Sequence, residues 1–183
     1  MARIVTRSYE SYADAETAVS RLEAAGLPSD DITILSSSPD KIEADAAQGA
    51  QVGGALGSGA GLMAGLAALP IPGVGPVLAA GWIFGTLAVG ATAGAAAGSL
   101  IGAMTGAGLG DDEAHFLAET VRRGGSVVSV RTSDSHVPAV EKIMDGVGPI
   151  DAAQRRSDYE REGWTGFDER AAPYRRPAWS EVS

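Results

Sequence analysis

The chain has 183 residues, a formal net charge of −9 and no cysteine. This length accommodates one domain of ordinary size with additional segments. The lack of cysteine excludes disulfides, thiol catalysis and cysteine-ligated metals. The acidic balance argues against binding to nucleic acids or to anionic lipid headgroups, because both attract basic surfaces. We therefore expect no nucleic-acid partner.

Residues 1–45 have the pattern of one βαβ unit. Residues 3–7 read as a short strand. A helix follows, with Ser11 as its expected N-cap and Gly26 as its expected C-terminal stop. Residues 31–35 then read as a second strand, because their apolar side chains alternate. We interpret this segment as the first half of an α+β domain.

The next segment, residues 46–110, contains no Asp, Glu, Lys, Arg or His. Glycine recurs there at every fourth position, and residues four apart share one face of an α-helix. A second helix can pack against such a face at backbone distance. We therefore predict a glycine-zipper helical hairpin. Its helix-packing residues are Gly49, Gly53, Gly57, Gly61, Gly65, Gly90, Gly94, Gly98, Gly102 and Gly106.

A proline–glycine cluster at residues 70–76 divides this segment, because proline cannot continue a helix interior. At 1.5 Å per residue the first arm, residues 49–69, would be about 31 Å long, and the second, residues 77–108, about 48 Å. The hydrocarbon core of a bilayer is about 30 Å thick. The first arm is thus long enough to span it, the second overshoots or bends, and both ends of the hairpin return to one side.

Two interpretations of the hairpin remain open, and both predict self-association. In the first, residues 49–108 enter the inner membrane, and the basic residues Lys41, Arg122 and Arg123 at the hairpin base place both termini in the cytoplasm. In the second, the protein is cytoplasmic and soluble, and the glycine faces pack protein-to-protein in a homo-oligomer. Purification without detergent at a defined oligomer size would favour the second interpretation.

Residues 111–151 repeat the pattern of the first half. Three acidic residues start a helix at its electrostatically favoured end. Residues 126–131 form the strongest strand pattern in the chain, a second helix follows, and residues 149–153 read as a weak edge strand. We predict an α+β fold, a ferredoxin-like βαβ-βαβ sandwich. The glycine-zipper helical hairpin interrupts it between strands two and three.

The last segment, residues 152–183, mixes six arginines with six acidic residues without a helical or strand period. We predict that it is disordered. It also contains five of the chain's ten aromatic residues, which is unusual for a spacer. We therefore expect it to dock, either on its own domain or on an unknown protein partner. The candidate docking residues are Trp164, Phe167, Asp168 and Tyr174.

No group of residues indicates catalysis. The two histidines, His115 and His136, lie at a helix start and at a helix cap, whereas a transition-metal site needs three or four ligands. The paired acids at residues 30–31 and 111–112 have ordinary roles in turns and caps. We therefore predict a non-enzymatic protein without catalytic, metal-binding or cofactor-binding residues.

Several stretches of the chain carry a family pattern in order. They are Tyr9-Glu-Ser-Tyr-Ala-Asp-Ala-Glu-Thr-Ala-Val-Ser-Arg-Leu, Gly26-Leu27-Pro28, Ile32-Thr-Ile-Leu, Ile71-Pro-Gly-Val-Gly-Pro-Val-Leu-Ala-Ala-Gly, Asp112-Glu113-Ala114 and Arg123-Gly124-Gly125-Ser126-Val127. This combination resembles the bacterial general stress protein 17M-like (YflT-type) domain. The resemblance covers about residues 1–131 and leaves the tail outside. It implies a bacterial stress-response protein and supplies no catalytic residues.

Overall fold

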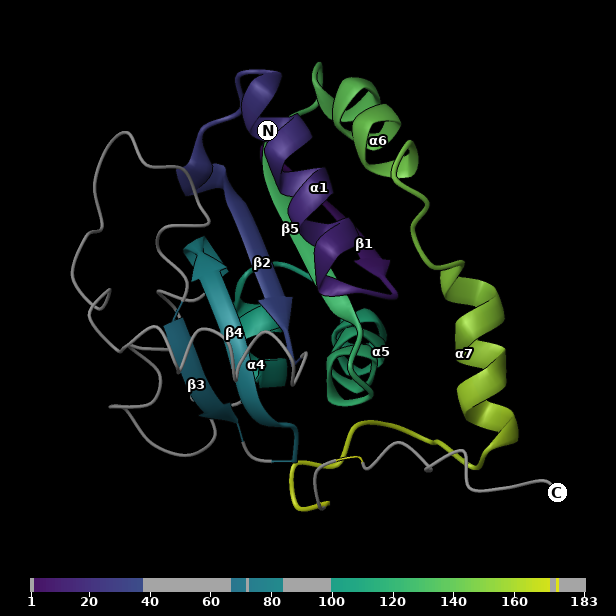
Figure 1. Ribbon diagram of the computed structural model, residues 1–183. Coiled ribbons are helices and arrows are strands. Elements are labelled where there is room, and N and C mark those ends of the chain that lie inside the picture. Colours follow the sequence, from purple (N-terminus) through teal and green to yellow (C-terminus); the bar gives the residue numbers. More distant parts are fainter. Residues whose placement is uncertain (1, 38–66, 72, 84–99, 172–173, 175–183) are drawn as a thin grey trace, which may run out of the picture.

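The strands in the described part of the chain form one antiparallel sheet (Figure 1). The computed structural model describes residues 2–37, 67–71, 73–83, 100–171 and 174. The strand order across the sheet is β1-β5-β2-β4-β3, so β5 and β2 lie inside the sheet and β1 and β3 form its edges. The strands are β1 (Ala2–Tyr9), β2 (Ile32–Ser36), β3 (Ala67–Ile71), β4 (Gly75–Gly81) and β5 (Ser126–Ser133).

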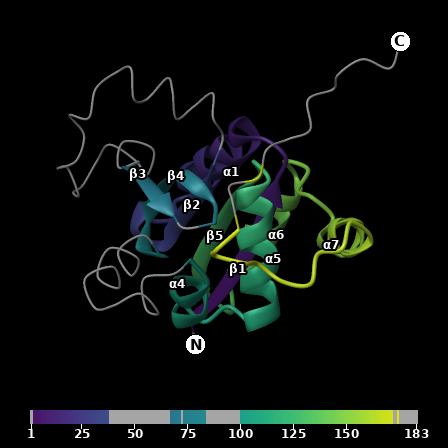
Figure 2. The same cartoon turned by 90° about the horizontal axis from the view of Figure 1, so that it is seen from below.

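Helices cover both faces of this sheet. The apolar residues of α1 and α6 join one core cluster, and those of α4 and α5 join the other. Figure 2 shows α1 and α4 on opposite sides of the strands, and Figure 1 shows α7 beside α5. The helices are α1 (Tyr12–Ala24), α4 (Leu100–Gly106), α5 (Asp111–Arg122), α6 (Val137–Asp145) and α7 (Ala152–Arg161), with a short 3-10 helix, η1 (Ser29–Asp31), before β2.

The side chains of the inner strands explain why both faces are covered. Every residue of β2 is buried. Ile32 and Ile34 belong to the core under α1 and α6, whereas Leu35 belongs to the core under α4 and α5. β5 divides in the same way, with Val128 in the first core and Val127 in the second. Because successive strand residues point to opposite faces, helices on one face alone would leave a row of apolar side chains in water.

Local signals in the first βαβ unit correspond to the observed elements. The Ser11 hydroxyl accepts a hydrogen bond from the Asp14 backbone N–H (3.1 Å), so Ser11 caps α1 as expected. Gly26 ends this helix with a φ of +89°, a backbone conformation that favours glycine. The strands expected at residues 3–7 and 31–35 correspond to β1 and β2.

The predicted helical hairpin of residues 46–110 is wrong over its middle part. Residues 67–71 and 75–81 are strands β3 and β4, which pair with each other as an antiparallel β-hairpin. Helix α4 agrees with the prediction, and residues 46–66 and 84–99 lie outside the described residues. None of the described helices is long and apolar enough to cross a bilayer.

The proline–glycine cluster explains why the chain turns into strands here. The Val74 N–H donates a hydrogen bond to the Ile71 carbonyl (3.1 Å), which closes the turn between β3 and β4. Gly73, inside this turn, has a φ of +76°. Pro76 lies in β4 ahead of the part that pairs with β2, because that pairing begins at Leu78. The missing N–H of this proline therefore leaves the β2–β4 ladder intact.

The α+β class is confirmed, but the ferredoxin-like sandwich is found only in part. Its two crossover helices, α1 and α6, lie on one face of the sheet as expected, whereas α4 and α5 cover the other face, which a sandwich with its helices segregated to one face leaves open. The strand beside β2 is β4, from within the predicted insertion, while residues 149–153 form no strand. Of these residues, Ile150 still donates its N–H to the Ser8 carbonyl of β1 (2.7 Å).

The prediction that residues 152–183 are disordered is wrong for the part that the structure describes. This part begins with α7, whose N-cap Asp151 accepts a hydrogen bond from the Gln154 N–H (2.9 Å). Within α7, Tyr159 is buried. A helix with so narrow an apolar face produces almost no periodic signal in the sequence, which is why it was missed.

A substitution at Gly81, at the end of β4, tests how closely β4 approaches β2. Its φ is +101°, and a Cβ there would lie 2.0 Å from the Ile32 carbonyl oxygen and 2.7 Å from Thr33 Cα. We expect Gly81→Ala to lower the free energy of unfolding by about 3 kcal/mol or more, because overlap with backbone adds to the strain of positive φ. Urea denaturation measures the loss.

Gly148→Ala is the matched control for this variant. Gly148 has a similar φ of +86°, but a Cβ there would meet nothing within 4 Å. The control therefore carries the backbone strain alone, about 1 kcal/mol. Equal losses in the two variants would contradict the close approach of β4 to β2.

Candidate functional site

After α6 the chain returns to the outer side of α5. Beyond α7 it passes beneath α5 toward the turn between β3 and β4 (Figure 1). We call residues 152–171 the docked tail. It covers α5 with aromatic side chains at its centre, charged side chains at the C-terminal end of α5 and a polar cavity at the N-terminal end.

The sequence of α5 equips it for two different contacts. Ala114, Leu117, Ala118 and Val121 belong to the core that α5 shares with the sheet. Asp111 lies in the first turn and Arg122 in the last turn, where each charge complements the helix dipole. The helix therefore packs on the sheet through one face and presents its remaining side chains to the tail.

Aromatic rings make the centre of the contact. Tyr159 of α7 is 3% exposed. Its ring centroid lies 5.9 Å from that of Phe116 in α5 and 6.0 Å from that of Trp164, which follows α7. The second pair meets edge to face, at 68°. Such pairs add about 0.5–1.5 kcal/mol to the stabilisation that burial provides.

A buried carboxylate organises the charged side chains at the C-terminal end of α5. Glu119 is 1% exposed, and its Oε1 accepts from Arg122 Nη2 and Arg123 Nε, both at 2.6 Å, while its Oε2 accepts from Arg122 Nε at 2.7 Å. Arg123 also donates to Glu162 just beyond α7. Burial lowers the pKa of Arg123, but the hydrogen bonds to Glu162 and Glu119 outweigh it, so the net pKa is raised.

The two arginines also stack on tail aromatics. The Arg123 guanidinium carbon lies 4.2 Å from the ring centroid of Tyr159 and 5.0 Å from that of Tyr174. The guanidinium carbon of Arg122 lies 5.4 Å from the Tyr174 centroid. Arg123 thus joins α5 to the tail through an ion pair and through cation–π contacts at the same time.

The tail is wedged between α5 and the β3–β4 turn at Phe167. This side chain is 7% exposed and joins the core on the α5 side of the sheet. Its backbone N–H donates to His115 Nδ1 at 3.0 Å. On the other side, a Cβ placed on Gly73 of the turn would lie 2.7 Å from the Asp168 carbonyl oxygen. The turn therefore needs glycine both for its φ and to admit the tail.

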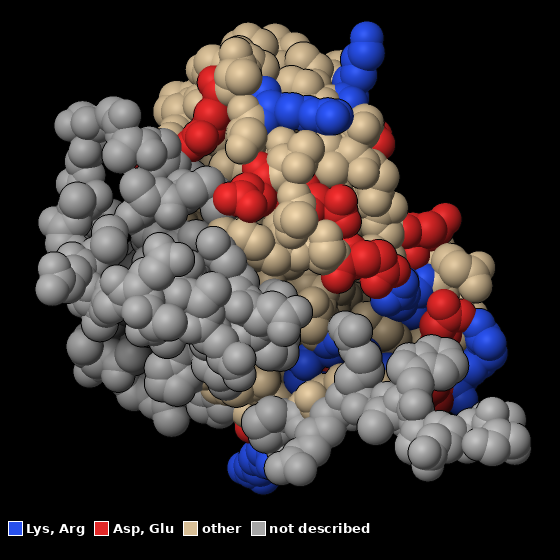
Figure 3. Space-filling view, viewed as in Figure 1, with Lys and Arg blue, Asp and Glu red and all other residues tan. Residues whose placement is uncertain are grey.

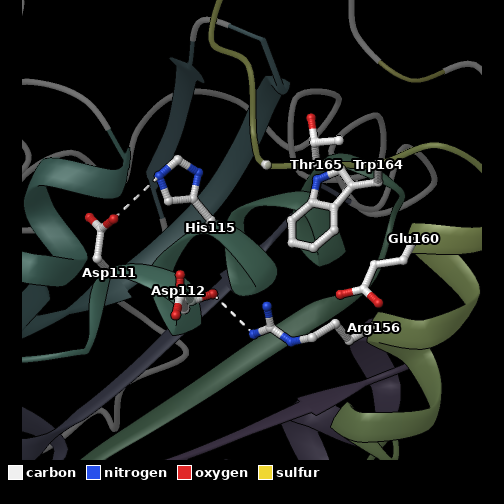
Figure 4. A pocket seen from close by; sticks show the side chains of 8 residues that line it. Asp111, Asp112, His115, Arg156, Glu160, Trp164 and Thr165 are labelled. Carbon is white, nitrogen blue, oxygen red and sulfur yellow. Dashed lines mark hydrogen bonds and ion pairs between the residues drawn. The ribbon is translucent and has the colours of Figure 1, made fainter.

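A cavity of about 480 Å³ opens at the N-terminal end of α5 (Figure 4). Arg156 of α7 donates to the Asp112 carbonyl at 3.0 Å, and His115 Nε2 lies 3.9 Å from Asp111 Oδ2. Among the described residues, no group of three or more potential ligands is arranged to hold a metal ion. The cavity is lined by Asp111, Asp112, His115, Arg156, Glu160, Trp164, Thr165 and Gly166.

Basic and acidic side chains both lie on the surface along α7. Basic and acidic side chains lie next to one another along the edge where α7 is found (Figure 3). One such pair joins Arg155 of α7 to Glu10, next to β1. The surface of α7 is therefore a set of local ion pairs, each worth little in water, and the aromatic rings contribute more to the docking.

The sequence-predicted tail residues have different roles. Trp164 and Phe167 pack against the chain's own domain, and Tyr174 lies over the arginines of α5. Asp168 is exposed, and its carboxylate accepts the backbone N–H of Arg170 (2.8 Å). Three of the four candidates thus contact α5 or the core, and the fourth organises the tail itself.

Of the predicted helix-packing glycines, the structure describes two. Gly102 and Gly106 lie in α4, where the buried residues are Leu100, Ala103 and Met104. A Cβ at Gly106 would meet no heavy atom within 4 Å. The other eight, Gly49, Gly53, Gly57, Gly61, Gly65, Gly90, Gly94 and Gly98, lie outside the described residues.

Sequence reasoning missed the residues of α5 that receive the tail. From the sequence we expect His115 at a helix start and assign Arg122 and Arg123 a role only in membrane orientation, and Glu119 is not singled out. The available signal was the excess of aromatic residues after residue 152. It indicates that the tail docks but does not reveal where, because the receiving groups come from another element.

The fold and this site define the class of protein. It is a small α+β protein whose aromatic C-terminal segment packs on a helix of its own domain. Residues 5–68 match the family model described as "Heat induced stress protein YflT domain". The resemblance noted in the sequence is confirmed over this stretch, which runs from β1 into β3. No curated protein and no solved structure matches the chain.

The contact between the turn and the tail predicts an effect of Gly73→Ala on docking. The variant adds a Cβ 2.7 Å from the Asp168 carbonyl oxygen at a φ of +76°. We expect chymotrypsin to cleave after Phe167 about tenfold faster, because cleavage follows the fraction of open tail. Gly26→Ala is the matched control, since Gly26 has a φ of +89° and no neighbour within 4 Å. Equal acceleration in both would contradict the wedge.

The buried carboxylate predicts a large effect of Glu119→Gln. The variant removes the carboxylate that Arg122 and Arg123 share, although their side chains are only 16% and 14% exposed, and leaves Arg123 its ion pair with Glu162. We expect the free energy of unfolding to fall by about 2–3 kcal/mol in urea denaturation. The control is Asp158→Asn, whose partner Arg161 is 68% exposed, with an expected change below about 0.5 kcal/mol. Similar losses would mean that Glu119 is not the organising group.

Proposed function

We propose that the protein is a non-enzymatic bacterial stress protein. It self-associates through the charge-free segments that flank β3 and β4, and these segments are joined to its α+β domain. The observation that supports this proposal most is that β3 and β4, the middle of the charge-free run, are strands of the domain's sheet. These strands therefore divide the charge-free run into two separate segments, residues 46–66 and 84–99.

This arrangement favours packing between protein chains and argues against insertion of the whole run as a single membrane hairpin. In a membrane hairpin the turn between β3 and β4 would be the end farthest from the domain. In the structure this turn contacts the docked tail of the same domain. Residues 84–99 would extend about 24 Å even if fully helical, which is shorter than the hydrocarbon core of about 30 Å. Helix α4 cannot lengthen this segment, because Leu100, Ala103 and Met104 are buried in the core.

The glycine spacing supports a second copy of the chain as the partner. Each glycine costs about 0.8–1 kcal/mol in a helix relative to alanine. A series of such residues is stable only if close packing offsets this cost, and matching small-residue faces permit that packing. Identical segments from two chains supply matching faces automatically. The proposal thus gives a homo-oligomer in the cytoplasm.

A second candidate places the charge-free segments in the inner membrane, with the domain and both termini in the cytoplasm. The observation that favours it is the run of 65 residues, 46–110, without a charged side chain. A helix on a protein surface normally carries a charged face. In this version residues 49–108 associate with the bilayer, and the glycine faces pair within it.

A non-enzymatic role is supported by how the charged groups of the site are used. Glu119 is occupied by two arginines, and His115 accepts the hydrogen bond of the tail. These groups hold the tail to α5 and do not converge on a common point where a substrate would react. The tail's target in this proposal is the chain's own domain.

Fractionation of cells that express the full-length protein separates the two candidates. A soluble protein that purifies without detergent at a defined multiple of 18.5 kDa supports the homo-oligomer. Retention in the pellet after alkaline carbonate extraction supports membrane insertion and overturns it. A soluble monomer by light scattering overturns both.

The glycine series predicts a position-specific effect on assembly. We expect Gly57→Leu or Gly61→Leu to shift the assembly to monomer in light scattering, because a side chain on the packing face separates the helices. Gly54→Leu and Gly59→Leu are the matched controls, since both lie off the four-residue series. Equal tolerance at all four positions would contradict packing through this face.

A further inference from the structure

The hydrogen bond between Phe167 and His115 determines the protonation state of the histidine ring. Phe167 donates its backbone N–H to His115 Nδ1 at 3.0 Å. A ring nitrogen accepts a hydrogen bond only through its lone pair, so Nδ1 carries no proton while the tail is docked. The remaining ring proton is then on Nε2, the nitrogen that lies 3.9 Å from Asp111 Oδ2.

The surroundings leave the tail little freedom to adapt at this point. The Phe167 side chain is 7% exposed, so its backbone cannot turn without exposing the ring. A Cβ on the neighbouring Gly166 would lie 3.7 Å from Nδ1, which is an ordinary van der Waals contact with the histidine ring. On the opposite side, Gly73 is packed against the Asp168 carbonyl. Any change at Nδ1 therefore acts on a constrained segment.

We infer that His115 is a proton-operated latch, whose neutral ring holds the tail on α5 and whose protonation releases residues 164–171. A proton on Nδ1 places two N–H donors opposite each other at the distance of a hydrogen bond. The bond is lost, and the N–H of Phe167 stays buried without an acceptor, which is costly. Histidine is the side chain that gains a proton between about pH 8 and pH 5.

Charged side chains from α5 and α7 line the cavity beside the ring. Asp111 and Asp112 come from its own helix, and Glu160 and Arg156 face it from α7 across the cavity (Figure 4). The β3–β4 turn and α4 also pack near this region and contain no titratable side chain. The tail, which packs directly on the ring, carries Asp168, Glu169 and Arg170 after Phe167.

The direction and size of the effect follow from linkage. The docked tail binds the neutral ring, so docking is complete at high pH and weakens as the pH falls. With one proton taken up on release, the docking equilibrium falls by up to about tenfold per pH unit below the titration of the released ring.

Hydrogen exchange of the full-length protein tests the latch. Mass spectrometry at about pH 7.5 and about pH 5.5 compares residues 163–171 with strand β5, each corrected for its unfolded exchange rate. We expect the protection of residues 163–171 to fall about tenfold or more at the lower pH while β5 stays protected. Unchanged protection of the tail segment overturns the inference.

Two variants identify the responsible group. His115→Asn keeps an amide oxygen near the position of Nδ1 but does not titrate, so the pH dependence should disappear. His136→Asn changes the other histidine, which is the exposed N-cap of α6, and should behave as the parent protein. A pH-dependent loss that persists in His115→Asn, or that disappears in His136→Asn, overturns the latch.

A spectroscopic measurement covers the case in which His115→Asn fails to dock at either pH. Nitrogen-15 NMR of the histidine rings reports directly which ring nitrogen carries a proton. We expect an unprotonated Nδ1 in the docked protein at about pH 7.5 and loss of the Phe167 amide contact as Nδ1 gains its proton. A protonated Nδ1 with the tail still docked overturns the inference.

Discussion

The apolar side chains on both faces of β2 and β5 set the constraint on which the rest of the structure depends. A strand with two apolar rows is stable only between two covering layers. Helices α1 and α6 supply one layer, and α4 and α5 the other. Tyr159 and Phe167 of the tail extend the second layer. The tail is therefore continuous with the core and is not merely attached to its surface.

The tail stays in place through contacts of unequal strength. Burial of a large aromatic side chain contributes about 1.5–3 kcal/mol, whereas the exposed ion pairs of α7 contribute little each. The hydrogen bond at His115 is small by itself, but it lies where the chain is wedged between helix and turn. A contact of this kind is suited to control, because changing it disturbs a segment without disturbing the core of the sheet.

The charge-free run has a double role in this structure. Its middle part supplies β3 and β4, which complete the sheet beside β2. This use explains why the run is apolar there, independently of any membrane. In the parts on either side, the glycine spacing is the feature that needs a partner, and we propose that a second copy of the chain is that partner.

The sequence by itself determined the elements whose signals are local. Ser11 and Gly26 specify the ends of α1, and the alternating isoleucines of β2 and the valine run of β5 specify strands, each within a few residues. Only the tertiary structure decided that residues 67–81 join the sheet, because a run of alanine, leucine and glycine is compatible with helix or strand until pairing with β2 selects one. It likewise decided where the tail docks. The carboxylate of Glu119, the ring of His115 and the tail aromatics acquire their roles only when the chain brings them together, and sequence spacing carries no record of that proximity.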